Sequence, residues 1–176
     1  QNYPEIKIVE YNGPVGMPYA RIKGFENVTG DIICCTDGDA WADKNWIKNI
    51  VKPLILNPEI TIVGGRLIMN NNLFWRFAMI GQFFRRKFIK DEESQFASGA
   101  NFACRKIDYE KVNGINPIIE LKEKLNLYFW AEDVYISQAL RQIGKFYVAW
   151  NAIIHTKMSP EQESIQAQKF LIPKWR

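Results

Sequence analysis

A run of mostly apolar residues, 31–36, ends in the triplet Asp37-Gly38-Asp39. Open α/β sheets bind ligands at the carboxyl ends of their strands, so a strand that ends in two carboxylates presents oxygen ligands at that edge. The triplet therefore outlines a site for a metal ion and phosphate groups. Asp and Gly are also the commonest turn residues after a strand, so a plain turn is the alternative on these residues alone.

The elements around the triplet alternate between helices and strands. A helix is expected over about residues 17–27, before the triplet. After it, Asp43 can cap a second helix whose apolar positions recur on one face over residues 46–54. Residues 60–69 then form the next strand. This order predicts an α/β fold with helices packed on a largely parallel sheet.

The rest of the chain contains further signals of regular structure. They are a short strand over residues 6–11, a strand around residues 101–105 before a short helix from Asp108, a helix from Glu132 to a stop at Gly144, and a strand from Lys145 to His155. The aromatic and basic residues 72–90 predict an amphipathic helix, which either packs on the core or lies on a membrane surface. We expect one domain over residues 1–157 and a polar tail over residues 158–176.

Composition excludes several classes of function. With 176 residues, 47% of them hydrophobic and 24% charged, the chain suits one globular domain. The net charge of +4 is scattered, which argues against nucleic-acid binding. The three cysteines form no C-x-x-C pair and are expected to be buried thiols in a reducing compartment. No apolar run is long enough for a membrane span and residues 1–20 lack a signal peptide, which favours a cytoplasmic protein.

Acidic and imidazole side chains fall at three places that a sheet would bring together. They are the pair Asp37 and Asp39, the pair Glu132 and Asp133, and His155 at the end of a strand. Asp39 and a neutral His155 are suitable ligands for Mn²⁺ or Mg²⁺, with a diphosphate in the remaining positions. Such a metal acts as a Lewis acid on a leaving phosphate. For His155 alone, a hydrogen-bonded histidine at a strand end is the alternative.

Glu132 and Asp133 closely follow Trp130. An aromatic ring can stack on a sugar, and a carboxylate beside it can take the proton of a sugar hydroxyl. The alternative is that both acids only stabilise the first turn of a helix through its dipole and its free N–H groups.

Ser98-Gly99-Ala100-Asn101 is a run of small residues before Phe102. Small side chains let a ligand approach the backbone, and the Asn101 amide can bind hydroxyl groups. A tight turn that enters a strand explains the run equally well.

Together these residues resemble the family 2 glycosyltransferases, which have the GT-A fold. The resemblance covers about residues 6–157. It rests on Gly16 through Ala20-Arg21 to Thr29-Gly30-Asp31-Ile32-Ile33, Asp37-Gly38-Asp39, Trp46-Ile47, Ser98 through Arg105, Val112-Asn113-Gly114-Ile115, Glu132-Asp133-Val134 and His155. It implies a Rossmann-like three-layer sandwich with a mostly parallel mixed sheet. Nothing in residues 1–20 matches the first nucleotide-binding half of the family, so the fold is expected to be N-terminally incomplete.

The resemblance also implies an activity, which is inverting transfer of a hexose from a UDP- or GDP-sugar to an acceptor hydroxyl with Mn²⁺ or Mg²⁺. By position, Asp37 and Asp39 correspond to the family's Asp-x-Asp motif, with Asp39 the surest metal ligand. Asp133 corresponds to the catalytic base, and Glu132 to the acid that helps bind the acceptor or orient the base. His155 corresponds to a histidine that joins the metal or the diphosphate.

The same resemblance assigns the substrate contacts. Arg21, Gly38 and Asp37 match donor-binding positions. Trp130 and the four residues from Ser98 to Asn101 are assigned to the acceptor side, where the acceptor is a sugar, a lipid-linked glycan or a protein. The helix expected over residues 72–90 would suit a lipid-linked acceptor at the cytoplasmic face of a membrane. The competing hypotheses are a catalytically silent GT-A-like module that binds a nucleotide or a partner, and a plain structural α/β domain.

Overall fold

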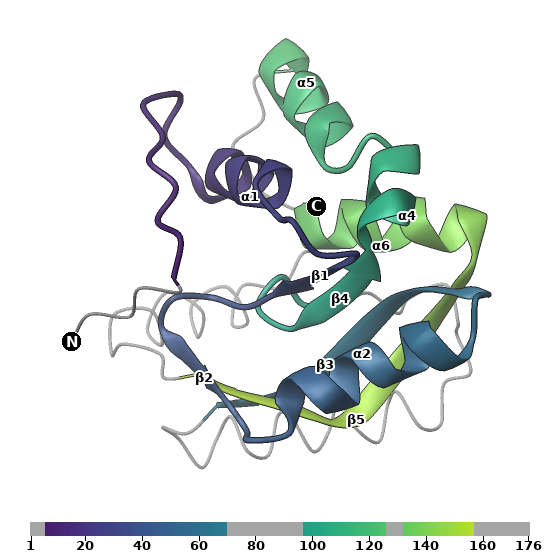
Figure 1. Cartoon of the computed structure of the whole chain (residues 1–176). Coiled ribbons are helices and arrows are strands. Elements are labelled where there is room, and N and C mark those ends of the chain that lie inside the picture. The colour runs from purple at the N-terminus through teal and green to yellow at the C-terminus, as the bar shows by residue number, and fades with distance from the viewer. Residues whose placement is uncertain (1–5, 70–96, 126–131, 157–176) are drawn as a thin grey trace, which may run out of the picture.

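The computed structural model describes residues 6–69, 97–125 and 132–156, and its centre is a five-stranded sheet (Figure 1). The strand order across the sheet is β1-β4-β3-β5-β2. The strands are β1 (Ile32–Cys35), β2 (Ala40–Ala42), β3 (Ile60–Met69), β4 (Phe102–Arg105) and β5 (Lys145–Thr156). The helices are α1 (Met17–Glu26), α2 (Trp46–Leu56), α4 (Lys106–Lys111), α5 (Asn116–Leu125) and α6 (Glu132–Ile143).

The sheet mixes parallel and antiparallel pairs. Both β1 and β3 pair antiparallel with β4, so they run in the same direction on either side of it. β5 is parallel to β3, and the short β2 is antiparallel to β5 at the edge. The expected mixed α/β sheet is confirmed. The expectation of a mostly parallel sheet needs correction among the described strands, because β4 is inserted between the two strands that the strand-helix-strand pattern joins.

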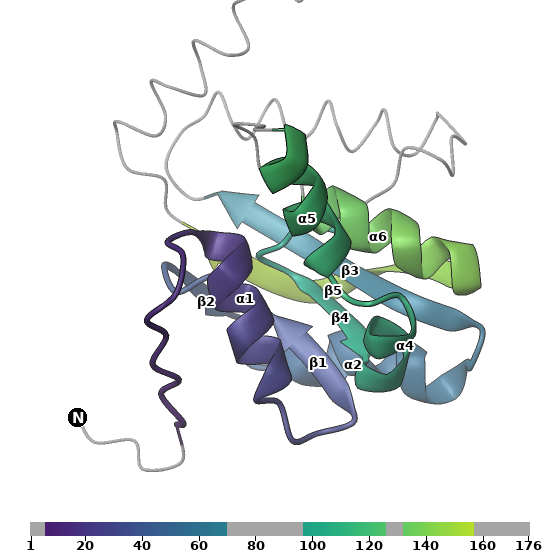
Figure 2. The same cartoon turned by 90° about the horizontal axis from the view of Figure 1, so that it is seen from above.

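Helices cover both faces of the sheet and complete the expected three layers (Figure 2). α2 packs on one face, and α1, α4 and α6 pack on the other. Side chains alternate along each strand, so Val63 and Ala103 belong to the core under α2, whereas Ile62 and Cys104 belong to the core under α1 and α6. Ile62 and Val63 are fully buried, and each such side chain contributes about 1.5–3 kcal/mol.

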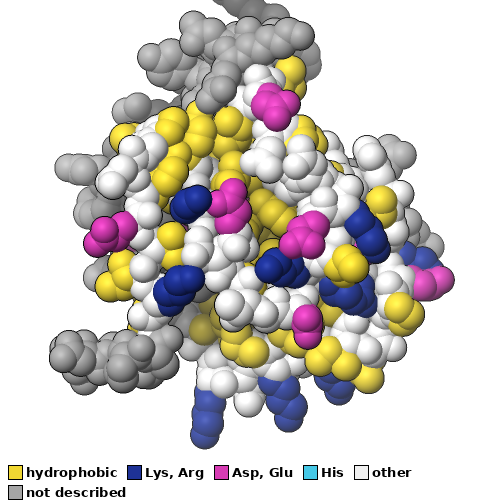
Figure 3. Space-filling view, turned by 45° about the horizontal axis from the view of Figure 1, so that its top comes forward, with side chains coloured by type: hydrophobic (Ala, Val, Ile, Leu, Met, Phe, Trp, Pro, Cys, Tyr) yellow, Lys and Arg dark blue, Asp and Glu magenta, His cyan; other side chains and the backbone are white. Residues whose placement is uncertain are grey.

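The surface on the side of α1 and α5 carries charges of both signs. Acidic and basic side chains lie near one another there, and apolar side chains are interspersed among them (Figure 3). The charge on this face is therefore mixed.

Most expected elements lie where the apolar pattern placed them. The strand over residues 60–69 and the helix from Glu132 to the residue before Gly144 are confirmed at both ends. Residues 6–11 do not form a strand, since no described strand pairs with them, and Ile6 and Ile8 are 62% and 83% exposed. β2 and α5 were not expected, and β2 is only three residues long.

The expected cap of α2 is also different in the structure. The N-cap residue is Asn45, which makes no side-chain cap hydrogen bond. The carboxylate of Asp43 instead contacts a histidine on β5. The Asp43 carboxylate therefore does not cap α2 but contacts a residue that is far from it in the sequence.

Three sequence predictions fall outside the described residues: the helix over residues 72–90, the tail over residues 158–176 and the acceptor role of Trp130. Within the described ranges, no helix has the length and apolar character needed to cross a membrane. Cys34, Cys35 and Cys104 are free thiols, and Cys35 and Cys104 are buried as expected, whereas Cys34 is only partly buried.

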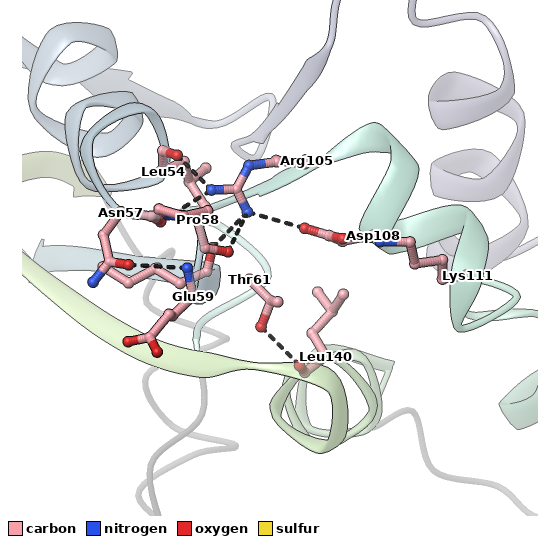
Figure 4. Close-up of polar contacts among 10 residues, drawn as sticks. Leu54, Asn57, Pro58, Glu59, Thr61, Arg105, Asp108, Lys111 and Leu140 are labelled. Carbon is pink, nitrogen blue, oxygen red and sulfur yellow. Dashed lines mark hydrogen bonds and ion pairs between the residues drawn. The ribbon is translucent and has the colours of Figure 1, made fainter.

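Arg105 holds the turn between α2 and β3 at one end of the sheet (Figure 4). Its guanidinium donates to the carbonyl oxygens of Leu54, Asn57 and Ile60, the last at 2.7 Å. It also pairs with Asp108 at 3.1 Å. The carbonyls at a helix C terminus lack helical partners, so Arg105 satisfies groups that the fold leaves open. This end of the sheet is structural.

Candidate active site

Three segments meet beyond the carboxyl end of β1 and line a small open pocket of about 150 Å³. They are the turn after β1, the loop before β4 and the start of α6, with α1 alongside. Seven of the lining residues were predicted from the sequence and Met17 was not. The lining residues are Met17, Arg21, Asp37, Ser98, Gly99, Ala100, Glu132 and Asp133.

A larger open groove of about 780 Å³ lies beside Arg105 at the other end of the sheet. Its basic side chains are already engaged, because Arg105 donates to four backbone carbonyls and Lys106 donates to the carbonyl of Val28 at 2.8 Å. The small pocket is lined by Asp37, Glu132 and Asp133, the acids that the sequence predicted to converge, and we take it as the candidate active site.

Arg21 joins the acid after β1 to the acid that begins α6. Its Nη2 donates to Asp37 Oδ1 at 2.8 Å, and its Nη1 forms an ion pair with Glu132. The side chains of Arg21 and Glu132 are only 11% and 5% exposed. A buried charge is costly unless it is paired and hydrogen-bonded, so each of these two side chains requires the other. Glu132 is therefore the counter-ion of Arg21.

Gly99 lets the loop before β4 approach this ion pair. A Cβ atom at Gly99 would lie 2.5 Å from Arg21 Nη1, closer than real Cβ contacts. The N–H of Asn101 donates to the carbonyl of Ser98 at 2.9 Å, which closes a tight turn. Both interpretations of the small-residue run therefore hold, because the turn itself lines the pocket.

Asp133 is held at the start of α6 by backbone donors. Its Oδ1 accepts from the N–H of Val134 at 2.8 Å, and its Oδ2 accepts from the N–H of Gly99 at 3.2 Å. Each carboxylate oxygen has a second lone pair. Asp133 can therefore still accept the proton of a substrate hydroxyl while its orientation is fixed.

Ser137 is a supporting residue that sequence reasoning missed. Its hydroxyl donates to the carbonyl of Asp133 at 2.6 Å and accepts from the N–H of Ala97 at 2.9 Å. Ser137 is fully buried, and along the sequence of α6 it lies between the apolar residues Ile136 and Leu140. A serine on the apolar face of an amphipathic helix was the available signal, since a buried hydroxyl needs a partner.

Asn101 has a different role from the one expected. Its side chain is 0% exposed, its Oδ1 accepts from Trp46 Nε1 at 2.9 Å, and its Nδ2 donates to the carbonyls of Arg66 and Ala152 at 2.9 and 3.0 Å. Arg66 and Ala152 lie at the register shift between β3 and β5, and Trp46 is the first residue of α2. The amide is used in stabilising this irregular pairing, so the structure contradicts its assignment to acceptor hydroxyls.

Asp39 and His155 lie on the other side of Asp37. Asp39 and Gly38 are in the exposed turn before β2, and no hydrogen bond or ion pair joins the Asp39 carboxylate to another described residue. His155 lies opposite Trp41 in the ladder between β2 and β5. Its Nε2 is 2.8 Å from Asp43 Oδ1, so its direct partner is Asp43 and not Asp39.

The donor atoms on this side fit a divalent metal in part. Within residues 6–69, 97–125 and 132–156, no three Asp, Glu, His or Cys side chains gather into a ready-made site. His155 Nδ1 is buried and has no hydrogen-bond partner in those ranges. This nitrogen and the Asp39 carboxylate are ligand types that Mn²⁺ or Mg²⁺ accepts, whereas Arg21 already neutralises Asp37. Asp39 and His155 are therefore the side chains of this side that would hold a metal, and the substrate would fill its other positions.

Cys35 lies at the end of β1, two residues before Asp37. Burial raises its pKa to about 11, although the Arg21 guanidinium acts in the opposite direction. The thiol is therefore protonated at neutral pH and is neither a nucleophile nor a metal ligand.

These features define an α/β protein with a GT-A-like fold and an acid-lined pocket at the carboxyl end of β1. The family model Glycosyl transferase family 2 matches residues 1–112. The chain belongs to this family, which confirms the resemblance found in the sequence.

Individual relatives match smaller parts or match weakly. A glucosyl-dolichyl phosphate glucuronosyltransferase of Haloferax volcanii is 40% identical over 53 residues, which is 30% of this chain and 17% of the relative. A glucosyl-3-phosphoglycerate synthase of Mycobacterium tuberculosis, solved with Mn²⁺ and UDP-glucose, is 16% identical with a TM-score of 0.46. That match covers 92% of this chain and 52% of the other. The chain thus spans much less than the length of the relatives it matches.

Proposed function

We propose that this chain carries the catalytic part of an inverting glycosyltransferase, which moves a hexose from a nucleotide-sugar to an acceptor hydroxyl. The observation that carries the proposal is that Asp133 and Asp37 line one pocket in a chain of this family. One carboxylate is held by backbone N–H groups, and the other is paired with Arg21. A base and a charged donor site are thus adjacent but separate.

Asp133 is the proposed general base. As the acceptor oxygen forms a bond to the anomeric carbon, Asp133 takes the hydroxyl proton, and the bond from that carbon to the diphosphate oxygen breaks. Attack on the face opposite the leaving group inverts the anomeric centre. The N–H of Gly99 and the N–H of Val134 keep the carboxylate oriented for this step.

Asp39 and His155 are the proposed metal ligands, and Asp37, Gly38 and Arg21 the proposed donor contacts. A bound Mn²⁺ or Mg²⁺ would supply a Lewis acid for the negative charge of the leaving UDP or GDP. Arg21 orients Asp37 through the 2.8 Å ion pair.

The proposed acceptor is a lipid-linked sugar bound near Ser98, Gly99 and Ala100. Its support is the Haloferax relative, a glucosyl-dolichyl phosphate glucuronosyltransferase. Small side chains at these positions leave room for a hydroxyl to reach Asp133. An acceptor of this kind implies work at a membrane surface.

The test compares Asp133→Asn and Asp39→Asn in the full-length protein, with Asp31→Asn as a matched control on an exposed acid outside the pocket. We expect Asp133→Asn to lower transfer by about 10²-fold or more and to leave calorimetric binding of UDP or GDP with Mn²⁺ intact. We expect Asp39→Asn to lose the metal-dependent binding. Full transfer by Asp133→Asn would refute the base assignment. Metal-dependent nucleotide binding without any transfer by the wild type would favour the silent binding module.

A further inference from the structure

The position of Asp43 is the starting point. It precedes α2, where an aspartate commonly accepts hydrogen bonds from the free N–H groups of the first turn. Only its backbone takes part there, because its carbonyl accepts from the N–H of Trp46 at 2.9 Å. Its carboxylate lies 2.8 Å from His155 Nε2 instead. A side chain that could have capped a helix is used to contact a residue of the candidate site.

The backbone fixes this contact. The N–H of Asp43 donates to the carbonyl of Ile153 at 3.0 Å, two residues before His155 on β5. Trp41, two residues before Asp43, pairs with His155 in the ladder. Asp43 and His155 are therefore held in register by main-chain hydrogen bonds on both sides, and the contact does not depend on a long flexible side chain.

The His155 imidazole is contacted on its face by Trp41 and at its edge by Asp43. The rings of Trp41 and His155 stack with their centroids 5.7 Å apart and an angle of 10° between their planes. Nε2 is at Asp43, and Nδ1 is buried without a hydrogen bond to any residue of the described ranges. A buried polar atom without a partner is unfavourable, and one that persists points to a ligand or a function.

The chemistry of the contact decides which nitrogen carries the proton. A carboxylate only accepts hydrogen bonds, so the nitrogen next to Asp43 must be the N–H. A neutral imidazole has one N–H, so the other nitrogen then has a free lone pair. Histidines that bind metals commonly donate their second nitrogen to a carboxylate in this way.

We propose that Asp43 is a positioning residue for His155, which holds the ring in the Nε2–H tautomer and leaves Nδ1 as the nitrogen that binds the ligand of the site. The role of Nδ1 depends on the proposed function above. The tautomer does not, since it is a property of the protein without metal or substrate. Failure of one is therefore distinguishable from failure of the other.

His155 is the only histidine of the sequence, so a ¹⁵N-histidine spectrum contains one imidazole. We would record it without metal, at alkaline pH where an imidazole is neutral, for the wild type, Asp43→Ala, the similarly sized Asp43→Asn and the control Asp31→Ala. We expect a slowly exchanging Nε2–H proton in the wild type and in Asp31→Ala, a weaker signal with faster exchange than the wild type in Asp43→Asn, whose amide oxygen still accepts but carries no charge, and loss of the signal in Asp43→Ala. An Nδ1–H tautomer in the wild type, or an unchanged signal in both Asp43 variants, would overturn the proposal.

Metal affinity gives the second measurement. Mn²⁺ binding in the presence of UDP or GDP, followed by electron paramagnetic resonance, should weaken by about 10–100-fold in Asp43→Ala and stay within twofold in Asp31→Ala. Unchanged affinity in Asp43→Ala would overturn the positioning role. If the wild type shows the expected tautomer and binds no Mn²⁺, the proposed metal function fails and the role of Asp43 in fixing the ring stands.

Discussion

The two sides of the candidate site are built differently. The base side consists of Arg21, Asp37, Gly99, Glu132 and Asp133, which come from four segments and are joined by ion pairs and backbone hydrogen bonds. The metal side consists of Asp39, Trp41, Asp43 and His155, on and around the edge strand β2. The first contains a buried ion pair, whereas Trp41 and the Asp43 side chain are 47% and 45% exposed.

This difference shows how burial determines what a charged group can do. A charge inside the protein must be satisfied by the protein itself, so Arg21 and Glu132 are committed to each other before any substrate binds. A carboxylate in water can remain without a partner, so Asp39 is available to a ligand. We expect the base side to govern the stability of the fold and the metal side to govern ligand binding.

The largest expected effect is that of Glu132→Ala on the base side. It leaves the buried Arg21 guanidinium with only Asp37, and breaking a buried pair costs about 3–5 kcal/mol in the free energy of unfolding. Asp39→Ala on the metal side should change it by no more than about 0.5 kcal/mol. Urea unfolding of both variants gives the comparison. Equal losses in the two variants would show that the two sides do not differ as we propose.

A smaller effect is expected for Gly99→Ala. The new Cβ would meet Arg21 Nη1 at 2.5 Å, and the guanidinium cannot move away without losing its ion pairs, so we expect a loss of about 1–3 kcal/mol. Gly38→Ala in the turn of the metal side is the matched control, since nothing lies within 4 Å of its Cβ position. Thermal unfolding measures both. A Gly99→Ala variant as stable as Gly38→Ala would mean that Arg21 is not locked in place.

The smallest expected effect on stability is that of Cys35, which lies two residues before Asp37 of the base side. Its pKa is raised to about 11 by burial, so the folded protein holds the thiol proton more tightly than the unfolded chain, whose thiol has a value near 9.0. This contribution to stability is complete below about pH 9 and is lost as the pH rises toward about 11. We expect Cys35→Ala to reduce the loss of stability between these values, measured by urea unfolding across the range.

The reactivity of the Cys35 thiol also tests whether the ion pair between Arg21 and Glu132 holds the base side closed. Its alkylation by iodoacetamide should be slow at neutral pH in the wild type, because little thiolate is present and the side chain is buried. Glu132→Ala should accelerate it if the base side opens, and Asp39→Ala should not. If Asp39→Ala alone accelerated the alkylation, the metal side rather than the base side would govern the stability of this region.

The parts of the fold that the sequence predicted correctly are those with a strong local pattern. The continuous apolar strand over residues 60–69 and the amphipathic helix between Glu132 and Gly144 are determined by side chains close together in the chain. The structure brings Asp37, Glu132 and Asp133 to one pocket, as predicted from acids at the ends of strands and helices that converge at one edge of a sheet.

The errors share a cause as well. Residues 6–11 have the composition of a strand, but a strand needs a neighbour to accept its hydrogen bonds, and none of the described strands lies beside it. Asn101 is a suitable ligand for hydroxyls by type, but the register shift between β3 and β5 uses its amide first. Both for residues 6–11 and for Asn101, the structure depends on hydrogen-bond partners that are distant in the sequence.

The sequence by itself determined the family, the elements with a strong local pattern and most of the residues that line the candidate site, since these depend on motifs and on local periodicity. Only the tertiary structure decided how the charges pair. Arg21 meets Glu132 across 111 positions of the chain, and Asp43 meets His155 across 112. No local pattern encodes such contacts, because they exist only after the sheet and its two helical layers have packed together.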